Sequence, residues 1–138
     1  MAASRPPSVK SLILADQVFR QAETGKWCII GVFEKILSQS FPCLHPSLGL
    51  FVRVEDAHGE YEVKIEFRDA ADRVLGSFEG MTLQVNDRLA SVAFGVQTIG
   101  LPLPAPGRYF FKLFLNGEVL MDHPVDAVQL SPPGGGPQ

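Results

Sequence analysis

The fold class is decided by a nine-residue stretch, Glu60-Tyr61-Glu62-Val63-Lys64-Ile65-Glu66-Phe67-Arg68. Apolar side chains occupy every second position of this stretch, and charged side chains fill the positions between them. Because successive side chains of a β-strand point to opposite faces, the alternation predicts a strand with one buried and one solvated face. Such strands are typical of antiparallel sheets.

The same alternation continues on both sides of this stretch. Apolar residues alternate from Leu48 to Val54, and the short link at residues 56–59 predicts a hairpin between that strand and the central one. Turn residues at 69–72 lead into a further strand over residues 74–78.

Turn signals elsewhere in the chain predict the remaining strands. Residues 22–25 separate a strand ending near Phe19 from one over residues 26–33, and Asn116-Gly117 separates strands at 109–115 and 118–121. A strand at 89–96 follows the turn residues Asn86-Asp87. One stretch is ambiguous, because the apolar residues at 32, 33, 36 and 37 also fit a single turn of helix before Phe41-Pro42.

About eight short strands at this spacing predict an all-β protein, a two-sheet antiparallel β-sandwich of the immunoglobulin-like type. A Pro-rich segment followed by Gly107 and Tyr109 fits a tyrosine corner, in which the hydroxyl group bonds to the backbone upstream. The spacing of Cys28 and Cys43 does not fit the disulfide of antibody domains, so this is not an antibody-type domain. Both cysteines are expected to be free thiols, because a chain without an export signal is expected in a reducing compartment.

Length and composition indicate a single domain. The chain has 138 residues, 46% of them hydrophobic, and a net charge of −3. We expect a β-sandwich domain over residues 9–130, with disordered tails at 1–8 and 131–138 because both are rich in Pro or Gly. The scattered basic residues argue against nucleic acid, and the lack of an export signal or of a long apolar run predicts a cytoplasmic protein without a membrane partner.

No motif carries a specific chemistry, so we predict no catalytic residue, no metal site and no cofactor. Thr24-Gly25-Lys26 lacks the other residues of a phosphate-binding loop. Cys43 and His45 lie in an expected loop but do not form a zinc motif by themselves. Asp16 interrupts an apolar strand, where it either caps a bulge or is buried with a partner. The alternative function is therefore a small ligand- or metal-binding protein, or an enzyme, that uses the Cys43/His45 loop together with Asp16.

The strand at 109–115 is apolar on both faces, which favours a protein partner. Phe110 and Phe114 point away from the face that carries Tyr109 and Phe111, and Lys112 lies between them. A strand of this kind is either covered on both sides or presents a patch to another molecule. The leading interpretation is a non-catalytic protein-interaction or assembly module, with self-association as one form of it.

Several motifs together resemble a family of small bacterial proteins of unknown function. The resemblance covers roughly residues 9 to 125 and rests on these residues: Asp16, Thr24-Gly25-Lys26, Ile30-Gly31-Val32-Phe33, Phe41-Pro42, His45-Pro46 and Pro106-Gly107-Arg108-Tyr109-Phe110-Phe111. It implies a bacterial, cytoplasmic β-domain. The motifs consist of turn and core residues, and the resemblance implies no catalytic residue.

Overall fold

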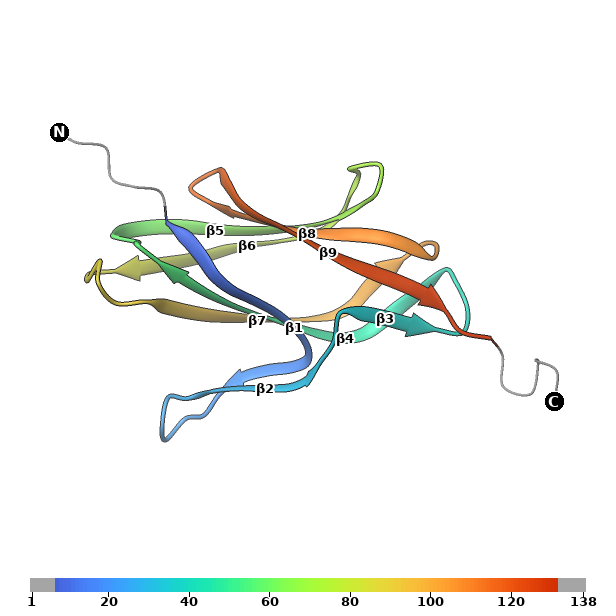
Figure 1. The fold of residues 1–138 in the computed structure, drawn as a ribbon, viewed down its shortest axis with the longest axis horizontal. Coiled ribbons are helices and arrows are strands. Elements are labelled where there is room, and N and C mark those ends of the chain that lie inside the picture. The colour runs from blue at the N-terminus through green and yellow to red at the C-terminus, as the bar shows by residue number, and fades with distance from the viewer. Residues whose placement is uncertain (1–6, 132–138) are drawn as a thin grey trace.

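The computed structural model describes residues 7–131 of the chain, and these residues form nine β-strands and no helix (Figure 1). The strands are β1 (Ser8–Arg20), β2 (Trp27–Val32), β3 (Lys35–Ser38), β4 (Cys43–Glu55), β5 (Gly59–Asp69), β6 (Val74–Val85), β7 (Val92–Leu103), β8 (Gly107–Leu115) and β9 (Glu118–Gln129). Within these residues there is no helix of the length and hydropathy needed to cross a bilayer. The expected tails at 1–8 and 131–138 lie almost entirely outside the described residues, although Ser8 already belongs to β1.

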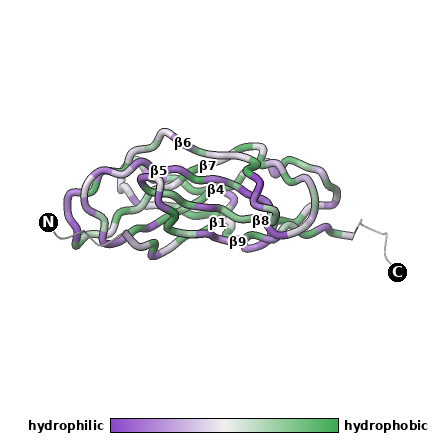
Figure 2. Tube along the Cα trace, turned by 90° about the horizontal axis from the view of Figure 1, so that it is seen from above, coloured by the Kyte–Doolittle hydropathy of each residue, from purple (hydrophilic) through white to green (hydrophobic). Residues whose placement is uncertain are grey.

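The strands form two sheets that pack face to face. The first sheet has the order β2-β1-β4-β7, and the second has the order β3-β9-β8-β5-β6. All neighbouring strands are antiparallel except β3 and β9, which are parallel. Hydrophobic and hydrophilic residues follow one another along the strands (Figure 2), as expected when each strand has one face toward a shared core.

This strand order is immunoglobulin-like. In that fold strands A, B and E share one sheet and strands C, F and G share the other. Here β1, β4 and β7 are neighbours in one sheet, and β5, β8 and β9 are neighbours in the other. β6 adds an edge strand next to β5, as the additional strand of variable-type domains does. The predicted all-β sandwich is confirmed, with nine strands where about eight were expected.

The expected hairpin between residues 48–54 and 60–68 is wrong. β4 and β5 belong to different sheets, so the link at residues 56–59 carries the chain across the core. The two alternating patterns therefore face each other: Val52 and Val54 of β4 are fully buried in the same core cluster as Val63 and Ile65 of β5. A short link between two alternating strands is compatible with either arrangement, and the need to bury both apolar faces selects this one.

Three aromatic rings lie where immunoglobulin domains place a tryptophan and a disulfide. The ring of Phe67 on β5 stacks on that of Tyr109, with centroids 5.2 Å apart, and lies 4.9 Å from that of Phe111. Tyr109 and Phe111 are on β8, and all three side chains are buried. Cys28 and Cys43 are free, as expected. These rings pack on one another on the inner face of the second sheet, without a covalent bond.

The predicted tyrosine corner at Tyr109 is confirmed. The Tyr109 hydroxyl donates a hydrogen bond to the carbonyl oxygen of Ala105 and accepts one from the Ala105 amide at 3.2 Å. These bonds fasten the crossing from β7 to the start of β8, because the hydroxyl satisfies both backbone groups of one residue in the turn.

The possible helical turn before Phe41 is absent. Residues 35–38 form β3, which pairs in parallel with residues 126–129 of β9. Ile36 is buried in the core and Leu37 is 55% exposed, so the apolar spacing comes from a strand with one inward residue. Pairing with a distant strand has overridden a local pattern that fitted both states.

We expect the substitution Tyr109→Phe to lower the free energy of unfolding by about 1 to 2 kcal/mol, because it removes two hydrogen bonds at a half-buried corner. Urea denaturation of the purified protein measures this loss. Tyr61→Phe is the matched control, since the Tyr61 hydroxyl bonds to the backbone of His58 in the same way at an exposed turn. An equal loss in both variants would contradict a special role for the corner.

Candidate functional site

The end of β1 and β2 form a hairpin that leaves the sandwich and lies over the outer face of the first sheet (Figure 1). Its inner side makes a second, small core in which Val18 packs on Phe51 together with Trp27. Gly49 and Gly95 allow this close approach: a Cβ at Gly95 would lie 2.6 Å from the Trp27 ring, and one at Gly49 would lie 2.7 Å from Val18. The glycines of the sheet therefore make room for the hairpin.

Asp16 marks the point at which β1 leaves the first sheet. β1 pairs with β4 as far as Ala15, and beyond Asp16 it pairs with β2 alone. The Gln97 side chain bridges the gap, because its amide nitrogen donates to the Asp16 carbonyl and its oxygen accepts from the Val18 amide, both at 3.0 Å. Of the two expectations for Asp16, burial with a partner is wrong, since the residue is exposed. The other, a capped bulge, is not seen either, because the pairing of β1 with β2 keeps its register through this position.

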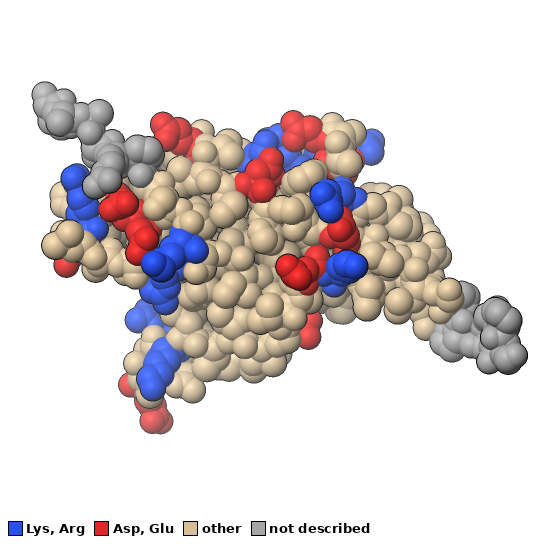
Figure 3. Space-filling model, viewed as in Figure 1, with Lys and Arg blue, Asp and Glu red and all other residues tan. Residues whose placement is uncertain are grey.

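The outer side of the hairpin is mostly apolar and is exposed, with one polar residue, Gln17, opposite Ile30. Phe19 pairs with Cys28 across the hairpin, and Ile30 and Val32 continue the same face along β2. The exposed fractions are 44% for Phe19, 51% for Ile30 and 64% for Val32. We call these four residues the hairpin stripe. Figure 3 shows the area over β2 without charged side chains, which gather at the tip of the hairpin.

Sequence reasoning missed the hairpin stripe, although a signal was present. Residues 27–32 are apolar on both faces, as residues 109–115 are, and only the second strand was interpreted in this way. Without the fold, nothing indicated that one side of residues 27–32 covers a sheet while the other faces solvent.

The predicted interaction surface on β8 lies on the outer face of the second sheet. Phe110, Lys112 and Phe114 all point away from the core and are half-buried. Phe114 lies next to Lys64 of β5, whose Nζ is 5.3 Å from the centre of the ring. Phe110 lies between Arg68 and Pro124 in the strand pairing. Neighbouring side chains of this sheet thus cover part of both rings, and an interaction role for this face stays a prediction.

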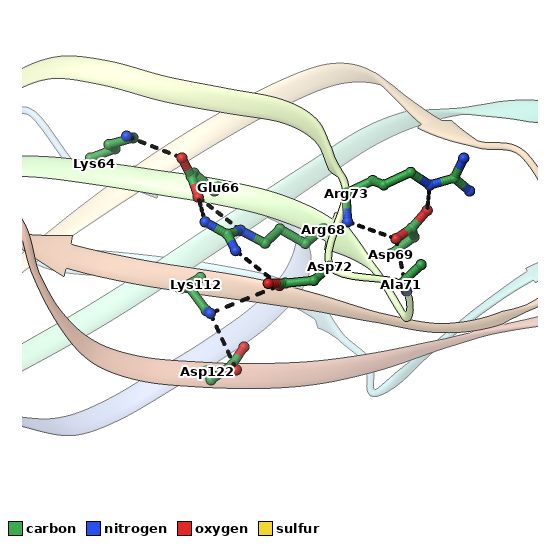
Figure 4. A network of polar contacts seen from close by, with 9 residues as sticks. All are labelled: Lys64, Glu66, Arg68, Asp69, Ala71, Asp72, Arg73, Lys112 and Asp122. Carbon is green, nitrogen blue, oxygen red and sulfur yellow. Dashed lines mark hydrogen bonds and ion pairs between the residues drawn. The ribbon is translucent and has the colours of Figure 1, made fainter.

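A network of charged side chains occupies the same face (Figure 4). Glu66 is at its centre and only 7% exposed. One carboxylate oxygen accepts hydrogen bonds from Arg68, and the other lies 3.0 Å from Lys64 Nζ. Arg68 reaches on to Asp72 at 2.9 Å, and Lys112 lies between Asp72 and Asp122 at 4.0 and 3.9 Å.

The network makes a buried carboxylate tolerable on an open sheet face. The hydrogen bonds from Arg68, and next those from Lys64, hold the pKa of Glu66 below its ordinary value against the opposing effect of burial. Three cations and three anions balance one another within this network. This arrangement stabilises the outer surface of the sheet.

The second predicted site, Cys43 and His45, lies in a strand, so the expected loop is wrong. Cys43 and His45 belong to β4 and pair with Leu103 and Leu101 of β7. Pro46 suggested a loop because it has no amide hydrogen to donate, and the structure places it at the one position of this segment without a partner in β7. Both side chains are half-buried rather than displayed on a loop.

His45 does not form a catalytic or metal-binding set with its neighbours. Its ring lies edge-on to Phe33 at 6.0 Å, and its Nε2 is buried with no hydrogen-bond partner among the described residues. Burial lowers the pKa of His45, and the nearby charge of Asp16 opposes this effect. Within residues 7–131 no group of three or more His, Cys, Asp and Glu side chains is placed to hold a metal ion.

We expect Glu66→Gln to destabilise the protein at neutral pH by about 2 kcal/mol, because Arg68 and Lys64 lose a charged acceptor at a buried position. The pKa of Glu66 is lowered by folding, so its contribution is complete above the unfolded value of about 4.3 and disappears as the pH falls through the lower folded value. The difference between wild type and variant therefore shrinks in acid.

Urea denaturation between neutral and acidic pH measures this difference. The control is Glu60→Gln, since Glu60 lies on the same face of β5, is exposed and forms no ion pair with any residue from 7 to 131. A loss that is the same at all pH values would contradict the assigned role of Glu66.

Solved structures match this one at low sequence identity. A Pseudomonas fluorescens alkylpurine DNA glycosylase, AlkC, bound to DNA containing an abasic site analog, matches with a TM-score of 0.58 and 12% identity. The match covers 91% of this chain and 31% of the glycosylase, so the chain spans about a third of that protein. An immunoglobulin-like protein from Pseudomonas aeruginosa matches over 92% of this chain and 100% of its own, with a TM-score of 0.43 and 9% identity.

Among curated proteins, no sequence matches this chain significantly. A model of the family of unknown function DUF6941 matches residues 10–128, which include every strand except the outermost residues of β1 and β9. The chain therefore belongs to the family of unknown function DUF6941.

Proposed function

We propose that this domain is a non-catalytic assembly module that associates with a second copy of itself through the hairpin stripe, Phe19, Cys28, Ile30 and Val32. The observation that carries the proposal is an uncharged and largely apolar face, with three exposed large apolar side chains, on a hairpin that projects from the sandwich (Figures 1 and 3). A contiguous apolar patch is characteristic of a contact surface, whereas single exposed apolar residues are ordinary.

The edge of the sheet beside the stripe adds to this argument. β2 is the outermost strand of the first sheet, and residues 27–32 contain no charge and no proline. Sheet edges in monomeric proteins are commonly protected by charged residues, by proline or by a bulge. Here Gly31, with a positive φ of 75°, is the only such irregularity within β2, and the Trp27–Ile30 part of the edge is regular.

The charges around the hairpin favour an antiparallel arrangement of two copies. Arg20 and Lys26 flank its outer end, with Glu23 beyond them in the turn, and Asp16 and Glu34 flank its inner end. A two-fold axis through the stripe places the outer end of one hairpin beside the inner end of the other. Basic residues then face acidic ones at both rims, while the apolar residues meet at the centre.

The outer face of β8 supports self-association less well. Its charges already neutralise one another within the chain, and Phe110 and Phe114 are partly covered by neighbouring side chains. The hairpin stripe has no comparable cover in the described residues. We therefore place the contact on the hairpin and treat the β8 face as the alternative interface.

We expect the wild-type protein to sediment as a dimer and the variant Ile30→Lys to sediment as a monomer, because the new charge lies at the centre of the apolar contact. Analytical ultracentrifugation over a concentration series measures the masses. Val74→Lys is the control: Val74 is 50% exposed, like Ile30, but lies on β6 in the second sheet, and its substitution leaves the dimer intact.

A third variant, Phe114→Lys, separates the two surfaces. A dimer that survives Phe114→Lys and dissociates with Ile30→Lys supports the hairpin. The reverse pattern moves the contact to the β8 face, and a wild-type protein that stays monomeric at every concentration overturns the proposal. Circular dichroism confirms that each exposed substitution leaves the fold unchanged.

A further inference from the structure

A cavity of about 330 Å³ opens between the two sheets, at the edge where β6 faces β7. Neither strand has a partner on that side, because β6 ends one sheet and β7 ends the other. The cavity reaches into the main core, where Leu48, Leu50 and Phe111 form its inner wall. Around its mouth lie Phe78 of β6 and Ile99 of β7.

Gly76 keeps this cavity open. It lies opposite Phe67 in the pairing of β5 with β6, so a side chain at this position would point inward. A Cβ built on Gly76 meets no atom within 4 Å, and its φ lies outside the left-handed region. Neither a turn nor a close contact therefore requires glycine here, although glycine within a strand costs about 0.5–1 kcal/mol relative to alanine.

This glycine differs from Gly49 and Gly95 of the first sheet. At those two positions a Cβ would collide with Val18 or Trp27 of the hairpin, so packing within the domain accounts for them. At Gly76 the adjacent space is empty. Glycine inside a strand commonly marks a site that a ligand or another backbone approaches closely.

The wall of the cavity selects an uncharged ligand. No Lys, Arg, Asp, Glu or His is among its lining residues. The hydroxyl of Thr98 is already engaged by the Leu48 carbonyl at 3.3 Å, and both ends of the Gln97 side-chain amide are bonded to Val18, Asp16 and Ser47. Ile99, another apolar residue of the lining, is 87% exposed.

We propose that this cavity binds a small uncharged apolar molecule, or the apolar part of a larger one, with Gly76 providing the space. Its volume is roughly twice that of the ~150 Å³ protein cavity that holds benzene, which corresponds to a two-ring aromatic molecule or a medium-length alkyl chain. The cavity lies between the two sheets, whereas the hairpin stripe lies on the side of the hairpin that faces away from them. The ligand proposal therefore does not depend on the proposed dimer contact.

Methyl NMR of the full chain with naphthalene and with 1-nonanol as probes tests the proposal. We expect saturable shifts of the methyl groups of Leu50, Ile65, Val96 and Ile99, and a rise in the melting temperature with each probe. Gly76→Leu fills the cavity, and we expect it to weaken binding by at least about tenfold and to raise the melting temperature of the free protein.

Two further variants make the result decisive. Gly76→Ala adds only a Cβ into open space and weakens binding less than Gly76→Leu. Thr82→Leu adds a similar side chain to the opposite, exposed face of β6 and leaves binding unchanged. Wild-type methyl groups that do not respond, or equal binding by wild type and Gly76→Leu, would overturn the proposal. So would shifts confined to the exposed backbone edge of β7, which indicate addition of a peptide strand instead.

Discussion

The whole structure depends on the burial of two apolar sheet faces against each other. β4 and β5 are adjacent in the chain and lie in opposite sheets, so their alternating residues form the two walls of one core. The core is closed by aromatic packing of Phe67 with Tyr109 and Phe111, at the positions where related folds use a tryptophan and a disulfide. Because no covalent link holds the sheets together, their separation depends on how well these side chains pack.

A sandwich buries only the inner face of each sheet, and this protein treats its two outer faces differently. The first sheet is covered by its own hairpin, which packs Val18 and Trp27 over two glycines. The second sheet carries a balanced network of charges around the buried Glu66. The hairpin covers the outer face of the first sheet, but its own outer side is largely apolar and exposed to solvent. That displaced apolar surface is the physical basis of the proposed assembly.

The glycines show where the domain is filled and where it is not. Gly49 and Gly95 are needed because another part of the chain lies against them, whereas Gly76 faces open space beside the core. Both groups lie within strands, where glycine is unfavourable. The first group is explained by packing within the chain, and the second leads to a ligand site between the sheets. The sequence alone does not separate the two groups, because all three residues are glycines. Only their surroundings in the fold differ.

The sequence by itself determined the fold class, the hairpin turns at residues 22–25 and 116–117, and the tyrosine corner at Tyr109, because these follow from period-two alternation and local turn chemistry. It also placed Phe110, Lys112 and Phe114 on the outer face of their strand. Only the tertiary structure decided that the link at 56–59 crosses the core, that Cys43 and His45 lie in a strand, that the hairpin stripe is exposed and that Gly76 borders a cavity. Each of these depends on contacts between residues far apart in the chain, and alternation tells which face a residue occupies without telling what lies against that face.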